Sequence, residues 1–167
     1  MHDAVLAGCR WLESTPWGIT IRASSWMYPV ILWFHFLGLS LWLGTSLTVD
    51  LRLMGVGERR LTAAELSNGL FAWSWIGFGV AFVGGFLLFS SEATTYVSNT
   101  PFNLKLAVAT PLALMWHVVV QRKTRMWTQT GHTSAFGKWA GVIEFVLWIS
   151  VVTASVGFLL TNAVTHP

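Results

Sequence analysis

The stretch from Trp26 to Val49 reads WMYPVILWFHFLGLSLWLGTSLTV and contains no aspartate, glutamate, lysine or arginine. A helix needs about 20 apolar residues to cross the hydrocarbon core of a bilayer, which is roughly 30 Å thick. Three further stretches meet this length, at residues 70–89, 102–120 and 140–160. The sequence therefore predicts an all-α integral membrane protein. Its four antiparallel spans should form one bundle, a single membrane domain over residues 1–167.

The composition of the chain agrees with a membrane protein. Of its 167 residues, 54% are hydrophobic and 10% are charged, whereas a soluble domain carries about 25% charged residues. This excludes a water-soluble globule, a disordered chain and a nucleic-acid-binding protein, because the net charge of +3 comes from a few residues in short loops. A single cysteine, Cys9, excludes a disulfide framework and a thiolate metal cluster.

The distribution of basic residues predicts the orientation of the spans, because loops rich in lysine and arginine stay in the cytoplasm. Three basic residues lie on one side of the predicted membrane, namely Arg10, Arg22 and Lys105. Seven lie on the other side, namely Arg52, Arg59, Arg60, Arg122, Lys123, Arg125 and Lys138. We therefore expect a multi-pass protein of the bacterial inner (cytoplasmic) membrane with both termini in the periplasm.

The segment before the first span, residues 4–23, predicts short amphipathic pieces that lie in the outer interface. Pro16 should break them, with Thr15 just before it as a capping candidate. Residues 61–69 predict a short surface helix ahead of the second span, because Thr62 and Glu65 have the spacing of a capping box.

Few ionisable side chains lie inside the predicted spans, and such groups are functional candidates because the bilayer makes them costly. His35 is in the first span and shares a helix face with Gly38, while His117 is in the third span. A small residue one turn from a histidine leaves room for a flat cofactor, and imidazole binds iron, copper or zinc. We therefore predict His35 and His117 as metal ligands, with Gly38 lining the same cofactor site.

The two histidines leave several arrangements open. Both could bind one haem, but a rise of 1.5 Å per residue places them up to about 13 Å apart in depth. Two separate sites, each with a different second ligand, are the competing arrangement. A third is that each imidazole forms a hydrogen bond to a helix carbonyl or a serine within the bundle.

Glu144, in the fourth span, should lie at the same depth as His117. A contact between them would orient the imidazole or serve a proton step. The alternative is a structural ion pair between Glu144 and Arg52 or Arg125. Asp50, at the predicted end of the first span, favours anchoring at the interface.

Lys105 lies near the start of the third span, where its side chain can extend outward along the bilayer. A role in binding haem propionates or another anion is the functional hypothesis, and simple anchoring is the alternative. Pro111, in the same span, should kink the helix.

The run His35–Gly44 (HFLGLSLWLG), followed by Val49–Gly55 (VDLRLMG), resembles an uncharacterised family of short four-helix bacterial inner-membrane proteins. The segments Phe89–Ala93 (FSSEA), Phe102–Lys105 (FNLK) and Trp11–Thr15 (WLEST) are similar to the same family, so the resemblance covers nearly the whole chain.

That family is distantly similar to two better-understood groups. The J-type protoporphyrinogen oxidases bind haem and carry a lysine followed about one helix length later by a histidine, a pattern matched by Lys105 and His117. The copper-resistance D membrane domain shares a helix with a histidine and a Trp-x-Gly motif, here His35 and Trp42–Gly44. The resemblance implies a haem or copper role. The sequence departs from the oxidases at the end of the first span, where Val49–Arg52 replaces their Pro-Arg ending. This departure puts porphyrin oxidation itself in doubt.

Together these features predict a haem b-binding, cytochrome-like membrane protein that transfers electrons between the outer face and a quinone or a redox partner protein. One alternative is a membrane protein that transports or handles copper or another small solute. Another is a structural subunit of a membrane complex. The lipid bilayer is an expected partner in each case, an oligomer stays open, and nucleic acid is excluded.

Overall fold

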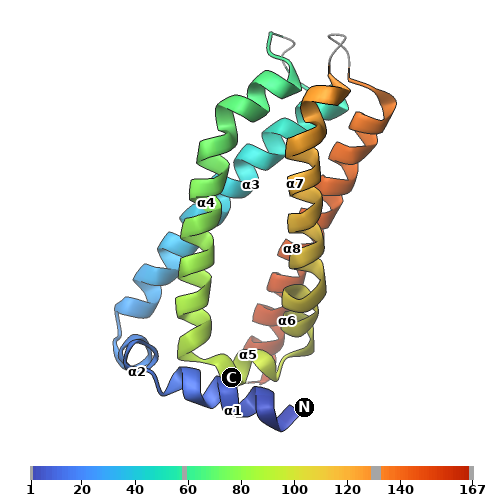
Figure 1. The fold of residues 1–167 in the computed structure, drawn as a ribbon. Helices are drawn as coiled ribbons and strands as arrows, with labels where there is room; N and C mark the ends of the chain where they lie inside the picture. The colour runs from blue at the N-terminus through green and yellow to red at the C-terminus, as the bar shows by residue number, and fades with distance from the viewer. Residues whose placement is uncertain (1, 58–59, 129–132, 166–167) are drawn as a thin grey trace.

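A computed structural model describes residues 2–57, 60–128 and 133–165 and confirms the all-α bundle (Figure 1). Four long segments of the described chain are long and apolar enough to cross a membrane. The first two are α3 (Met27–Met54) and α4 (Ala63–Ser91), and the fourth is α8 (Ala135–Thr165). The third is built from α6 (Thr100–Leu104), the π-helical turn η1 (Lys105–Ala109) and α7 (Thr110–Trp127). The protein is therefore a multi-pass membrane protein.

Three short helices lie across one end of the bundle, which we call the α1 end (Figure 1). They are α1 (His2–Glu13), α2 (Pro16–Ala23) and α5 (Ala93–Val97). The break expected at Pro16 is confirmed, because Pro16 begins α2 and the hydroxyl of Thr15 accepts a hydrogen bond from the Gly18 N–H at 3.3 Å.

The opposite end, where α3 and α7 end and α4 and α8 begin, we call the basic end. Of the seven basic residues expected there, Arg59 lies outside the described residues.

The spans are longer than the sequence analysis predicted. α3 continues five residues beyond Val49 to Met54, and Gly55 then ends it in the left-handed conformation. The helix expected over residues 61–69 is present from Ala63 onward, as the first turns of α4 itself. The capping box of Thr62 and Glu65 is present and begins one continuous helix, since no residue after it interrupts the backbone hydrogen bonds.

The third span is irregular where proline was expected to disturb it. Pro111 is near the start of α7 and has no N–H to donate to the preceding turn. The turn just before it, η1, is π-helical, and the Thr110 N–H bonds to the Lys105 carbonyl. Such turns restore backbone hydrogen bonds around a proline in a membrane helix. Lys105 therefore lies at the start of a distorted turn.

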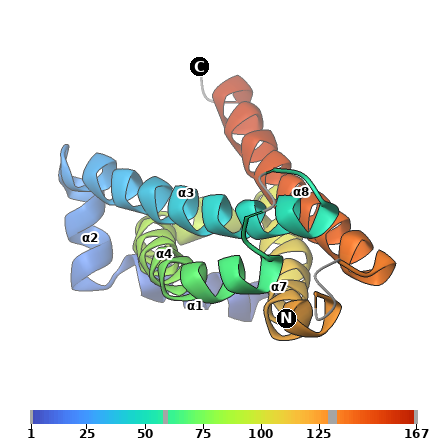
Figure 2. The ribbon, with the colours of Figure 1, turned by 90° about the horizontal axis from the view of Figure 1, so that it is seen from above.

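The four spans pack unevenly. α4 lies against α3, whereas α8 contacts both α3 and α7. α4 and α7 lie apart over much of their length in Figure 1, and the view from above in Figure 2 shows α8 crossing α3. The bundle is thus held together mainly by the α3–α4 and α3–α8 contacts.

The α3–α4 contact depends on two glycines. A Cβ atom placed on Gly38 would lie 2.5 Å from the Ala81 nitrogen, and one on Gly77 would lie 2.7 Å from the Trp42 nitrogen. The two backbones therefore touch, which is how membrane helices associate when small residues face each other.

Replacing Gly38 with alanine should destabilise the bundle by about 1–3 kcal/mol, because the new methyl group collides with the α4 backbone. Gly44→Ala is the matched control on the same helix, since nothing lies within 4 Å of a Cβ there. Thermal unfolding in detergent micelles measures both variants. Equal stability of the two would contradict the close contact of α3 and α4.

Candidate functional site

His117 and Glu144 are buried together in the half of the bundle nearer the basic end. Nδ1 of His117 on α7 lies 2.5 Å from Oε1 of Glu144 on α8, and their side chains are 3% and 1% exposed. The Nε1–H of Trp148, one turn further along α8, approaches the same oxygen at 3.4 Å. The expected contact between Glu144 and His117 is thus present, and Glu144 fixes the orientation of the imidazole.

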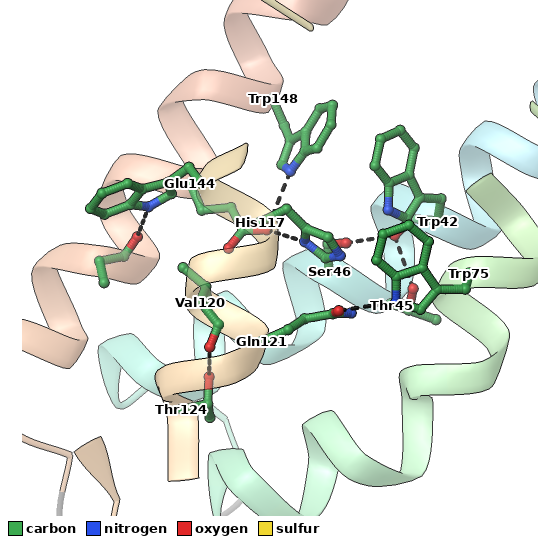
Figure 3. Close-up of polar contacts among 12 residues, drawn as sticks. Trp42, Thr45, Ser46, Trp75, His117, Val120, Gln121, Thr124, Glu144 and Trp148 are labelled. Atoms are coloured by element: carbon green, nitrogen blue, oxygen red, sulfur yellow. Dashed lines mark hydrogen bonds and ion pairs between the residues drawn. The ribbon is translucent and has the colours of Figure 1, made fainter. Parts of the chain in front are cut away.

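Three indole rings surround the imidazole of His117 (Figure 3). The ring centroids of Trp42, Trp75 and Trp148 lie 5.9, 6.1 and 6.4 Å from that of His117, each in an edge-on arrangement. Trp75 also donates a 3.0 Å hydrogen bond to Gln121. The indoles fill the space around the ring, so the described structure shows no room for a macrocycle there.

Asp50 joins this group from α3, and the expectation that it anchors the chain at the interface is wrong. Its side chain is 1% exposed. It lines the same small cavity as Glu144 and interacts electrostatically with that carboxyl group. The cause of its burial is the approach of α8, because a Cβ atom on Gly141 would lie 3.0 Å from the Asp50 carbonyl oxygen. α3 also continues past Asp50, which places the carboxyl group one turn inside the helix end.

We call Asp50, His117 and Glu144 the buried cluster. Among the described residues, no donor bonds to either Asp50 oxygen or to Oε2 of Glu144, and Nε2 of His117 has no partner. The ion pairs expected from Arg52 or Arg125 do not form. Nε of Arg52 donates to the Leu61 carbonyl, and Arg125 is exposed.

A small cavity adjoins the buried cluster. Its volume is about 10 Å³, which is about the space that one water molecule needs. Its polar lining includes all three members of the cluster together with Ser67, Ser74, Gln121 and Thr45. The Ser74 hydroxyl is 3% exposed and has no hydrogen-bond partner in the described structure. The cavity is therefore lined by polar atoms without partners, which have hydrogen bonds to offer to a water molecule.

His35 lies elsewhere, on α3 in the half nearer the α1 end. Its Nδ1 is 2.7 Å from the Ala81 carbonyl oxygen of α4. Two glycines accommodate the side chain, because a Cβ on Gly84 or on Gly85 would lie 3.0 Å from His35 atoms. The side chain is half-buried. The hydrogen bond to a helix carbonyl that was one alternative for His35 is present.

Lys105 lies within electrostatic range of His35, although 70 residues separate them in the chain. The Lys105 ammonium is near enough to interact electrostatically with the imidazole. It lies 4.8 Å from the centre of the Phe102 ring. Lys105 is half-buried, so it lies against the protein at the start of η1 while remaining accessible.

The other two predicted cofactor residues do not lie with His35 and Lys105. Gly38 faces the α4 backbone. His117 packs on Trp42, which is two helical turns from His35, about 10 Å along α3. Among the described residues, no group of three or more His, Cys, Asp or Glu side chains could hold a metal ion.

Asp50 is a site residue that was not predicted from the sequence. The signal that could have found it is the apolar pattern after it, where Leu51, Leu53 and Met54 continue the helix and Arg52 is the only charged residue before Gly55.

Glu144→Ala should lower the free energy of unfolding by about 3 kcal/mol, because it leaves His117 and Asp50 buried without a partner. Glu144→Gln is the control, since its amide oxygen still accepts the hydrogen bond from His117 and should retain more of the stability. Thermal unfolding in detergent measures both variants. An alanine variant as stable as the parent chain would contradict the buried contact.

Comparison with protein-family models, curated proteins and solved structures gives no match to this chain.

Proposed function

We propose that this protein binds a b-type haem through His35 and takes part in electron transfer in the bacterial inner membrane, with its basic end in the cytoplasm. The observation that carries the proposal is the hydrogen bond between Nδ1 of His35 and the Ala81 carbonyl oxygen. A carbonyl oxygen can only accept a hydrogen bond, so Nδ1 holds the proton of the neutral ring. Nε2 then presents its lone pair, which is the form of imidazole that binds haem iron.

The surroundings of His35 support this role. A metal-binding histidine usually donates its other N–H to a carbonyl or a carboxylate, which fixes the ring. Here the two glycines of α4 let the ring lie against the helix backbone. The side chain is only half-buried, so it is partly accessible. The donor type and its orientation therefore fit a haem iron.

Lys105 would hold the negative end of the cofactor. Haem carries two propionate groups, and its ring is apolar. The Lys105 ammonium interacts electrostatically with His35, and no carboxylate within the described ranges pairs with it. A charged donor beside an apolar surface suits a propionate, because such hydrogen bonds are stronger than neutral ones.

Haem bound at His35 would supply one-electron redox chemistry within the membrane. A quinone dissolved in the bilayer or a redox protein at the α1 end would be the electron partner. The protein contributes the ligand, the cationic group and a low-dielectric environment.

His35→Ala should abolish haem binding, whereas His117→Gln should retain it, because the described structure has no space for a macrocycle at His117. Optical spectra of detergent-purified protein, oxidised and then dithionite-reduced, measure this when haem is supplied during expression. A colourless parent protein would contradict the proposal. If that colourless protein bound copper and lost it on His35→Ala, the copper alternative would replace haem.

Lys105→Ala should weaken haem binding roughly ten- to a hundredfold, because a hydrogen bond to a charged group contributes about 1.5–3 kcal/mol. Lys105→Arg keeps the charge and should bind within a few-fold of the parent chain. Haem titration of the apoprotein measures both dissociation constants. Equal affinity of the alanine and arginine variants would remove Lys105 from the site.

A further inference from the structure

We infer that Asp50, Glu144 and His117 form a proton-binding site that exchanges protons with water at the basic end of the bundle. This inference is independent of haem, because none of the three residues contacts His35 or Lys105 in the described structure.

The two carboxyl groups require a proton between them. Asp50 and Glu144 are each 1% exposed, line the same cavity of about 10 Å³ and interact with each other electrostatically. Two carboxylates this close repel strongly, and a hydrogen bond between carboxyl groups forms only when one of them is protonated. Among the described residues, no other donor bonds to the Asp50 oxygens or to Oε2 of Glu144. A shared proton therefore supplies the hydrogen bond that no other donor in the described structure provides.

The neighbouring groups do not neutralise the cluster in another way. The residues that face the cavity from α4 are Ser67, Leu70 and Ser74, which do not titrate. α7 contributes Gln121 besides His117, and its residues Arg122, Lys123 and Arg125 are exposed. Arg52 on α3 bonds to the Leu61 carbonyl. One shared proton leaves one negative charge on the two carboxyl groups, which a second proton removes.

His117 gives a proton a route to the carboxyl pair. Its Nε2 has no partner, and the side chain lines the water-sized cavity. A proton that arrives at Nε2 lets the ring release its Nδ1 proton to Glu144, 2.5 Å away. The proton count is conserved in this step. The imidazole thus connects the cavity to the shared proton.

Access to this site is one-sided. Asp50 lies four residues before the end of α3, and Ser67 lies four residues after the start of α4, which is about 6 Å of helix in each case. On the side toward the α1 end, Trp42 and Trp148 pack against each other at 4.4 Å between centroids, and Trp42 packs on Phe78 at 4.7 Å. These rings separate the cavity from that half of the bundle, so protons should arrive from the basic end.

Infrared spectroscopy of the full chain in lipid tests the inference, because a protonated carboxyl group has a C=O stretching band that carboxylates lack. The parent protein should show this band at neutral pH, and the band should shift in D₂O. Asp50→Asn, a variant of the same shape, should abolish the band. Asp3→Asn, at an exposed position of α1, should leave it unchanged.

Absence of the band from the parent protein would overturn the inference, as would its persistence in Asp50→Asn or its failure to shift in D₂O. Ser67→Leu tests the route, because it fills the cavity on the side of the basic end. The deuterium shift should become slower in this variant and stay unchanged in Ser40→Leu, whose site on α3 is exposed on the helix surface. An unchanged rate in Ser67→Leu would overturn the assigned route.

Discussion

The carboxyl group of Glu144 lies inside a membrane bundle, where an unsatisfied charge would cost several kcal/mol. Side chains from three helices surround this carboxyl group and offset the cost of burying it. α7 provides His117 at 2.5 Å, α8 itself provides Trp148, and α3 provides Asp50. Because the three helices converge at Glu144, α8 approaches α3 closely at Gly141, and indole rings pack around His117. The cluster thus fixes how the α7–α8 pair joins α3.

The contact between α3 and α4 has a different physical basis. α3 and α4 approach through Gly38 and Gly77 until their backbones touch, which requires no polar group. α3 therefore takes part in both kinds of contact along its length. His35 and Lys105 lie in the half nearer the α1 end, and the buried cluster lies in the half nearer the basic end. This separation gives one small bundle two chemically distinct regions, which we propose serve electron and proton binding.

The four spans were predictable because runs of about 20 apolar residues leave few alternatives in a bilayer. The contact between His117 and Glu144 was also predictable, since both residues lie at equal depth on neighbouring spans. The burial of Asp50 was not, because it depends on five further residues of α3 and on the approach of α8 at Gly141. Helix ends are the least certain part of a sequence-based prediction. Likewise, periodicity placed Gly38 beside His35, but only the packed structure shows that α4 covers it.

A double-mutant cycle on Asp50 and Glu144 tests most directly whether their carboxyl groups hold the bundle together as a pair. The free energies of unfolding of Asp50→Ala, Glu144→Ala and the double variant would be measured against the parent chain in detergent. Residues in contact typically show coupling energies of about 0.5–3 kcal/mol. We predict that the double variant is less destabilised than the sum of the single variants by an amount in this range. Additivity of the two substitutions would contradict the shared buried site.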